Sequence, residues 1–209
     1  MKVLNLYSCI GGNRKLWGGG IEVTAVEYDP KIARAYQEYF PNDKVVVTDA
    51  HQYLLEHYKE YDFIWASPPC PSHSRIRIYS AVARGQNEAI YPDLKLYEEI
   101  IFLDNYFEGK YCVENVIPYY DPLIAPTKKL HRHLYWTNFP ISDFVITNDR
   151  KHDDIKSNSI VYGFDISKTD IDDKVKTLRN MVDPELGLHI LNCARNIITK
   201  QNIHQTELF

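Results

Sequence analysis

The sequence predicts an α/β protein built on a mostly parallel sheet. Short apolar runs alternate with stretches of helical spacing through the first two thirds of the chain. The apolar runs do not alternate with polar residues, which is typical of strands that helices cover on both faces. With 209 residues, of which 44% are hydrophobic and 25% charged, the chain is long enough to bury a core and has the composition of a folded domain.

Six apolar runs are predicted to form strands. The first, Val3–Tyr7, leads into a glycine-rich turn, and the fourth, Phe63–Ala66, stops at Pro68 and Pro69. Proline ends a strand there because it has no N–H to donate to a neighbouring strand. The other predicted strands are Ile21–Glu27, Val45–Val47, Tyr111–Val116 and His133–Thr137.

Four stretches are predicted to form helices. Apolar residues recur every three or four positions in Lys31–Phe40, and His51–Tyr58 is expected to follow the third strand as a helix. Asp93 could cap a helix that runs to about Phe107. Pro184–Lys200 is predicted as a closing helix.

The chain divides into three parts. Residues 140–177 are polar and charged, with only short apolar pieces, and we expect a loop-rich insert or a small subdomain there. Residues 1–139 form the main domain, and residues 178–209 are expected to pack back on it. No internal repeat or low-complexity tract interrupts this pattern.

Charge, cysteine content and hydropathy limit the classes of function. The formal net charge of −4 excludes a basic coat over the whole surface, although a local basic face for nucleic acid remains possible. The start of the chain has no long apolar run, and no stretch approaches the length of a membrane span. The four cysteines are widely spaced, which favours a reduced thiol state. We therefore expect a cytoplasmic protein without a membrane partner.

Polar residues gather where the predicted strands end. Ser8, Glu27, Asp49, Ser67–Cys70 and Glu114–Asn115 each follow or close an apolar run. Parallel sheets bind ligands beyond the carboxyl ends of their strands. The sequence therefore predicts a binding site at this edge.

The first three of these ends fit a nucleoside pocket. The glycines of the turn Ser8–Asn13 could let the backbone approach a ligand, or could simply make a turn. Glu27 could accept two ribose hydroxyls and Asp49 an adenine amino group, although each could instead cap the next helix. Tyr7 and Tyr28 could stack on the same ligand or belong to the core. Without a phosphate-binding glycine fingerprint, the pattern favours S-adenosylmethionine over NAD.

Cys70 is the sharpest candidate for chemistry. Two prolines stiffen the chain before this thiol, which lies in the polar segment Ser67–Ser72. A thiolate is a strong nucleophile, and the alternative is an inert half-buried thiol. Cys9, Cys112 and Cys193 lie in apolar runs, where we expect inert thiols.

Glu114-Asn115-Val116 closes the fifth predicted strand. Glu114 and Asn115 could read the edge of a base, and a protonated glutamate could hold a ring nitrogen and make the neighbouring carbon electrophilic. The alternative is an ordinary capped strand end. Cys70 and Glu114 at neighbouring strand ends favour the catalytic interpretation.

A basic loop follows Cys70. It carries Arg75, Arg77 and Arg84 and no acidic residue before Glu88. In an acidic chain, this loop suggests a phosphate-bearing partner, although a solvated arginine loop is the alternative.

These motifs, in this order, resemble the DNA cytosine-5 methyltransferase family over about residues 3–139 and 178–198. Pro69-Cys70 matches the family's nucleophile motif, and Glu114-Asn115-Val116 matches the acidic motif that follows it. The remaining matches are Asn5-Leu6-Tyr7-Ser8-Cys9-Ile10-Gly11-Gly12 to the glycine motif, Glu27-Tyr28 to the ribose ligand, Asp49 to the third-motif aspartate, and Arg179-Asn180-Met181-Val182 to the near-terminal motif.

The resemblance implies a Rossmann-like S-adenosylmethionine-dependent methyltransferase fold and methylation of cytosine C5 in DNA, with S-adenosylhomocysteine as product. It implies base flipping and a covalent bond from Cys70 to cytosine C6. The implied catalytic residues are Cys70, Glu114, Asn115, and Arg132 or His133 as the contact to cytosine O2. The implied cofactor contacts are Tyr7, Ser8, Cys9, Ile10, Gly11, Gly12, Glu27, Tyr28, Asp49, Pro69, Leu96, Asn180 and Met181. The implied nucleic-acid contacts are Ser72, Ser74, Arg75, Arg77 and Arg84, and no metal is implied.

The chain departs from the family pattern in two places that bear on function. The family's Gln-x-Arg-x-Arg strand aligns with Lys129, His131 and His133, which is why Arg132 and His133 both stay open. The target-recognition region is reduced to residues 140–177, a compactness that resembles phage- or prophage-encoded members and leaves open a partner subunit or oligomer that supplies recognition. The same chemistry on tRNA, and a catalytically weak regulatory homologue, are the alternatives to a double-stranded DNA methylase.

Overall fold

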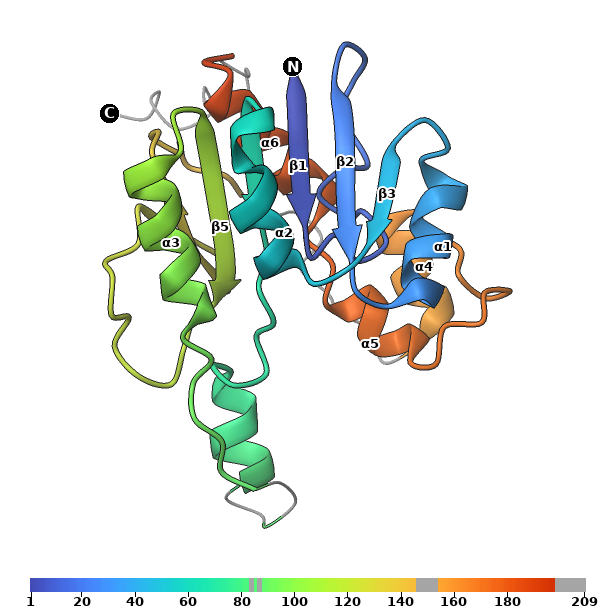
Figure 1. Cartoon of the computed structure of the whole chain (residues 1–209). Coiled ribbons are helices and arrows are strands. Elements are labelled where there is room, and N and C mark those ends of the chain that lie inside the picture. Colours follow the sequence, from blue (N-terminus) through green and yellow to red (C-terminus); the bar gives the residue numbers. More distant parts are fainter. Residues whose placement is uncertain (83–84, 86–87, 146–153, 198–209) are drawn as a thin grey trace, which may run out of the picture.

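A seven-stranded sheet forms the centre of the protein (Figure 1). The structure is a computed structural model, and it describes residues 1–82, 85, 88–145 and 154–197. The strand order is β3-β2-β1-β4-β5-β7-β6. The first five strands in the chain are parallel, whereas β7 runs antiparallel to both of its neighbours. The strands are β1 Lys2–Leu6, β2 Glu22–Glu27, β3 Lys44–Val47, β4 Phe63–Ala66, β5 Lys110–Val116, β6 Lys128–Leu130 and β7 His133–Thr137. The predicted α/β class with a mostly parallel sheet is confirmed.

Helices follow β2, β3 and β4, whereas the connection from β1 to β2 contains no helix. A 3-10 turn, Tyr58–Glu60, follows α2, and a π-helix, Arg77–Val82, projects beyond the carboxyl edge of the sheet (Figure 1). The α-helices are α1 Pro30–Tyr39, α2 Ala50–His57, α3 Lys95–Tyr106, α4 Ile155–Tyr162, α5 Lys174–Arg179 and α6 Pro184–Ala194. Within the described residues, no helix combines the length and the apolar character needed to cross a membrane.

The two faces of the sheet bury separate cores. In Figure 1, α2 and α3 lie in front of the sheet and α6 lies behind it. Successive side chains of a strand point to opposite faces of the sheet. Leu4 and Ile64 therefore face α2 and α3, whereas Val3 and Trp65 face α6. This two-sided burial explains why the strands read as continuous apolar runs.

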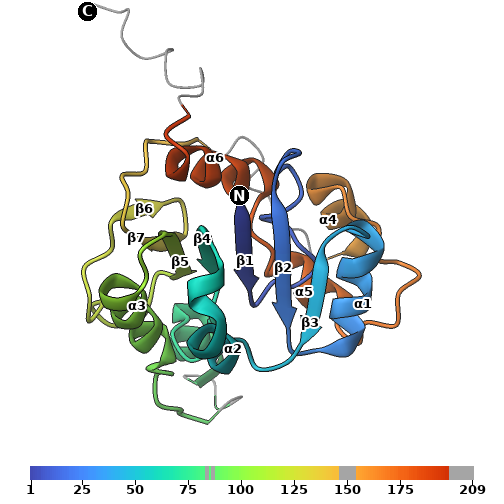
Figure 2. The same ribbon diagram turned by 45° about the horizontal axis from the view of Figure 1, so that its top comes forward.

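The insert forms two short helices that share a third core with α1. Phe164 and Leu178 are fully buried in it, together with Ile10 from the turn after β1 and Ala35 of α1. Ion pairs from Lys31 and Arg34 of α1 to Asp172 and Asp170, at 2.6 and 2.8 Å, join the same segments at the surface. Both views place α4 and α5 beside α1 (Figure 2).

Two helix ends differ from expectation for a physical reason, one strand was not predicted, and most other bounds shift by one residue. Helix α3 begins at Lys95 with Leu94 as its N-cap, so the predicted cap Asp93 is wrong, although the N–H of Lys95 donates to Asp93 at 3.1 Å. Helix α6 ends at Ala194 rather than near Lys200, because Asn196 adopts a left-handed conformation with φ 55° that turns the chain. Strand β6 was not predicted, since only three residues pair there and two are lysines.

Candidate active site

The carboxyl ends of five parallel strands meet at one edge of the sheet. Register places Leu6 of β1 between Val26 of β2 and Ala66 of β4, and Ala66 opposite Val113 of β5. The segments that follow these strands therefore start side by side. They carry the polar residues predicted to form the site.

The turn after β1 is held by Glu27. One carboxylate oxygen of Glu27 accepts the N–H of Cys9 at 2.9 Å, and the other accepts the N–H of Asp29 at 3.0 Å. Tyr7 and Cys9 have positive φ angles of 55° and 49°, so two non-glycine residues bend sharply here. Burial raises the pKa of the Glu27 carboxyl despite these hydrogen bonds. Each oxygen retains a lone pair that could accept a ligand hydroxyl.

The two glycines of the turn serve protein packing. A Cβ on Gly12 would lie 2.4 Å from the carbonyl oxygen of Val182 and 2.9 Å from Cβ of Met181. A Cβ on Gly11, which has φ 85°, would lie 2.4 Å from the ring of Phe40. The glycines thus bring the C-terminal segment and α1 against the turn, and nothing in this packing requires a ligand.

Several groups near the turn fit S-adenosylmethionine. The Oγ of Ser8 is buried and has no hydrogen-bond partner among the described residues, so a ligand atom could supply one. The ring of Tyr28, directly after Glu27, is 77% exposed and could stack on a base. Asp49 caps α2 by accepting the N–H of Gln52 at 2.9 Å, as its alternative interpretation predicted, and its other oxygen lies 4.0 Å from Lys95. A nucleoside with hydroxyl and amino groups matches this donor and acceptor set.

Other predicted cofactor residues turn their side chains into the core. Ile10, Leu96 and Met181 are buried in the hydrophobic clusters, so only their main chains could face a cofactor. Asn180 and Pro69 are exposed. Cys9 directs its sulfur toward the carbonyl of Thr177 at 3.7 Å, and burial raises the pKa of this thiol to about 12.

Cys70 lies in a turn that is attached to β5. The side-chain amide of Asn115 donates to the carbonyl of Pro68 at 2.9 Å, and this contact is buried. The carbonyl of Cys70 accepts the N–H groups of His73 and Ser74 at 3.0 and 3.1 Å. Asn115 thereby fixes the two prolines, and the turn fixes the backbone of Cys70 itself.

The segment after Cys70 is anchored on its other side. Buried His73 lies 2.6 Å from the hydroxyl of Tyr120 through Nδ1, and its carbonyl accepts the N–H of Tyr119 at 3.1 Å. Burial lowers the pKa of His73 and so favours the neutral ring. Ser72 accepts the N–H of Asp93 at 3.0 Å. The chain on both sides of Cys70, from Pro68 to His73, is thus held by contacts with other segments.

The basic loop uses its arginines partly within the protein. Arg75 donates to the carbonyl of Pro118 at 2.9 Å, next to a bridge between Ser74 and Pro118, and Arg77 donates to the carbonyl of Glu88 at 2.8 Å. Arg84 lies outside the described residues. Arg75 and Arg77 each use one N–H within the protein, and their guanidinium groups keep their positive charge.

Glu114 and His133 face each other across β5 and β7. The Nε2 of His133 lies 3.5 Å from Oε1 of Glu114, and only 8% of the Glu114 side chain is exposed. Arg132 is exposed at the tip of the β6–β7 turn, where its carbonyl accepts the N–H of Ile117 at 3.2 Å. Of the two residues left open for the cytosine contact, His133 is the one beside Glu114.

Tyr135 lies beside Glu114 of the predicted site, and sequence reasoning did not single it out. It pairs with Glu114 in the β5–β7 register, is fully buried, and its hydroxyl has no hydrogen-bond partner among the described residues. Burial and the Glu114 carboxylate raise its pKa. The alternation of His133–Thr137 could have suggested a tyrosine facing β5, but the pairing with Glu114 depends on strand register.

The apolar run around Cys193 predicted an inert thiol, but the structure gives this thiol polar partners that favour its ionisation. Its sulfur lies 3.7 Å from Nε2 of His189 and 3.7 Å from Oγ of Ser142. Burial opposes ionisation, but these hydrogen bonds lower the pKa of the Cys193 thiol to about 7. Burial keeps the pKa of Cys112 well above its usual value.

At pH 7.5 we expect iodoacetamide to alkylate Cys193 at least about tenfold faster than Cys9 or Cys112, because only the thiolate reacts. Peptide mass spectrometry over time measures the three rates. His189→Gln should slow alkylation of Cys193 alone. Equal rates at the three cysteines in the wild type would contradict the expectation.

Comparison with known proteins supports the motif assignment. Residues 1–102 match the family model described as C-5 cytosine-specific DNA methylase. This segment contains the glycine turn, Glu27, Asp49 and Pro69-Cys70. No curated protein sequence matches the chain.

Solved structures of methyltransferases show a distant likeness. An S-adenosylmethionine-dependent methyltransferase from Agrobacterium tumefaciens is 19% identical over 57% of this chain and 40% of its own, with a TM-score of 0.40. The DNMT2 of Spodoptera frugiperda is 24% identical over 55% of this chain and 35% of its own, with a TM-score of 0.38. The matches thus span well under half of those chains, and at these scores they add no weight to a function. The resemblance to cytosine-5 DNA methylases that the motifs predicted is confirmed, over residues 1–102, by the family model itself.

Proposed function

We propose that this protein transfers a methyl group from S-adenosylmethionine to C5 of cytosine in double-stranded DNA, through a covalent bond between Cys70 and C6 of the flipped base. Methyl transfer to cytosine C5 is the chemistry of the family that residues 1–102 match. The observation that carries the covalent mechanism is the buried hydrogen bond from Asn115 to Pro68, since it ties the turn of Cys70 to the strand that ends in Glu114.

Cytosine C5 is a poor nucleophile, and Cys70 would correct this. Its thiolate attacks C6, and the electron pair of the C5–C6 double bond moves toward C5 and the ring. When bound, S-adenosylmethionine supplies an electrophilic methyl group, which C5 takes, leaving S-adenosylhomocysteine. A base then removes the proton from C5, and the S–C6 bond breaks to restore the ring and the thiolate.

Glu114 would stabilise the ring while C6 is attacked. Its carboxyl group, almost fully buried, could share a proton with N3 of cytosine and accept the charge that develops there. His133 lies 3.5 Å from that carboxyl group and could donate to cytosine O2. Asn115 acts through Pro68, so it is a positioning residue.

The base must leave the stack to reach this edge, at a cost of a few kcal/mol. The projecting segment after Cys70 supports such a role, because Ile76 and Tyr79 are 70% and 67% exposed and flank Arg77. These side chains could contact the DNA at the position in the stack that the flipped base has left. Recognition of a target sequence could require residues 140–177 or a partner subunit.

Purified protein should therefore transfer label from S-[methyl-³H]adenosylmethionine to DNA. We expect digestion of labelled plasmid DNA to release 5-methyl-2′-deoxycytidine, and a parallel reaction with tRNA to release little labelled nucleoside. If only tRNA is labelled, the proposed DNA substrate is wrong and the substrate is RNA, whereas the proposed methyl-transfer chemistry stands. Binding of the methyl donor without transfer to either polymer would overturn catalysis by this chain and favour a regulatory homologue.

A further inference from the structure

Glu99 is a fully buried carboxyl group that the proposed reaction does not use. It lies in α3, its side chain is 0% exposed, and its Oε2 has no hydrogen-bond partner among the described residues. Its other oxygen, Oε1, accepts from the hydroxyl of Tyr7 and lies 3.0 Å from Nδ1 of His51. Burying a carboxyl group is costly unless it is partnered, and here both partners converge on one oxygen.

The two partners come from the segments that carry the proposed cofactor contacts. Tyr7 directly precedes the turn that Glu27 holds, and His51 stands two residues after Asp49. Glu99 itself lies one helical turn after Leu96 in α3. A single carboxyl group therefore joins the end of β1, the start of α2 and the start of α3.

Tyr7 depends on this contact for its geometry. Its φ of 55° is uncommon for a residue with a Cβ, and a strained backbone persists only where its surroundings hold it. The hydrogen bond from its hydroxyl to Glu99 fixes the far end of the ring. Without that bond, the backbone at Tyr7 can relax, and the turn that begins at Ser8 moves with it.

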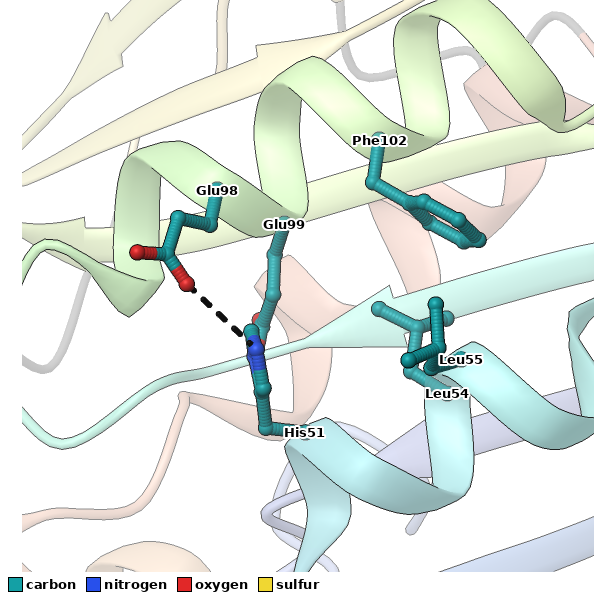
Figure 3. A pocket seen from close by; sticks show the side chains of 6 residues that line it. All are labelled: His51, Leu54, Leu55, Glu98, Glu99 and Phe102. Atoms are coloured by element: carbon teal, nitrogen blue, oxygen red, sulfur yellow. Dashed lines mark hydrogen bonds and ion pairs between the residues drawn. The ribbon is translucent and has the colours of Figure 1, made fainter.

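Figure 3 shows His51 between Glu99 and Glu98, with Leu54, Leu55 and Phe102 beside it around a cavity of about 200 Å³. The second ring nitrogen of His51 lies 3.5 Å from Glu98. The hydrogen bond to Glu99 raises the pKa of His51, and burial raises the pKa of Glu99. Asp49, Asp93 and Lys95 are the other charged groups that act on this cluster.

We propose that Glu99 is a positioning residue for the methyl donor, and that it sets donor affinity by holding Tyr7 and His51 in place around the proposed pocket. This inference rests on the proposed function, since it assigns the cluster to the donor site of that reaction. A purely structural role would not require a carboxyl group at position 99, because an apolar side chain of similar volume would fill the core at least as favourably.

The test measures binding of S-adenosylhomocysteine by calorimetry, the melting temperature without ligand, and kcat and KM for the methyl donor. Tyr7→Phe and Glu99→Gln should each raise the dissociation constant about tenfold, the effect of one hydrogen bond to a charged group. The double variant should bind no worse than Glu99→Gln alone, because that substitution already removes the charged acceptor on which the Tyr7 hydroxyl depends. KM for the donor should rise while kcat at saturation stays near the wild-type value.

Glu108→Gln is the matched control. It carries the same substitution at an exposed glutamate just after α3 that does not line this cavity. We expect its dissociation constant to stay within about twofold of wild type, as for most surface substitutions. Wild-type affinity should fall as pH rises through the raised pKa of His51, since the protonated ring interacts best with Glu99. Glu99→Gln should weaken this dependence, and the remaining part reflects the contact of His51 with Glu98.

The outcomes separate this inference from the proposed function. If the wild type binds S-adenosylhomocysteine and the Tyr7 and Glu99 variants match Glu108→Gln, the positioning role is wrong and the methyltransferase remains. If the variants lose kcat and stability while donor affinity is unchanged, Glu99 is structural. If the wild type does not bind the donor or its product, the proposed function fails first.

Discussion

Cys70→Ser is expected to abolish methyl transfer, by about a thousandfold or more in kcat, while donor binding persists. A serine hydroxyl stays protonated at neutral pH and attacks an aromatic carbon poorly, whereas a thiol reaches its thiolate readily. The backbone hydrogen bonds of the turn should survive the change, because the carbonyl of residue 70 can still accept the N–H groups of His73 and Ser74. Label transfer to DNA and calorimetry with S-adenosylhomocysteine measure the two properties.

Trapping identifies the covalent step directly. On DNA that contains 5-fluorocytosine, the wild type should form an adduct that survives denaturing electrophoresis, since fluorine at C5 cannot leave as a proton does. Cys70→Ser should form none. Cys193→Ser serves as the control, because this cysteine lies on α6 with His189 and should be dispensable for the adduct. Normal methylation by Cys70→Ser would disprove the mechanism.

Gly187→Ala is expected to destabilise the fold by about 3 kcal/mol. Replacing glycine by alanine inside an exposed helix usually stabilises it by up to about 1 kcal/mol, so the expected sign is reversed here. A Cβ at position 187 of α6 would lie 2.4 Å from the carbonyl oxygen and 2.6 Å from Cα of Asn13. These are backbone atoms, and Asn13 is fixed by a buried amide pair with Asn5, so neither side can yield cheaply.

Urea denaturation measures the free energy of unfolding of this variant. Gly18→Ala is the control, since a Cβ at that position meets no atom within 4 Å and should change stability by less than about 0.5 kcal/mol. Because Asn13 ends the turn that begins at Ser8, Gly187→Ala should also weaken donor binding. Stability equal to that of Gly18→Ala would show that α6 can shift away from the turn without cost.

The sequence was sufficient for features that depend on local pattern. Phe63–Ala66 and His133–Thr137 were predicted with their observed bounds, because an apolar run ends in each case at a polar or proline-rich segment. The polar residues at the strand ends were also readable, since the rule for parallel sheets places them at one edge. Cys70 and Glu114 required only that two predicted strands be neighbours, which the register of β4 and β5 bears out.

Features that depend on contacts between residues far apart in the chain could not be predicted from the sequence. Glu99 lies 92 positions from Tyr7, and nothing in an amphipathic helix distinguishes a buried acid from a solvated one. The contact of His133 with Glu114 depends on the antiparallel pairing of β7 with β5. Cys193 looked inert because its partner Ser142 comes from a segment 51 residues earlier, whereas His189 alone, four residues away, gave only a weak signal.

The third core has a consequence for engineering specificity. Ile10 of the turn after β1 is buried together with Phe164 of the insert and with Leu178 directly after it, so the insert supports the loop that precedes Gly11. Exchange of residues 140–177 for an unrelated segment would strip part of that support unless the new segment restored equivalent apolar contacts. If the insert contributes to the proposed target recognition, substitution at exposed positions of α4 would therefore alter preference with less damage to the turn than exchange of the whole segment.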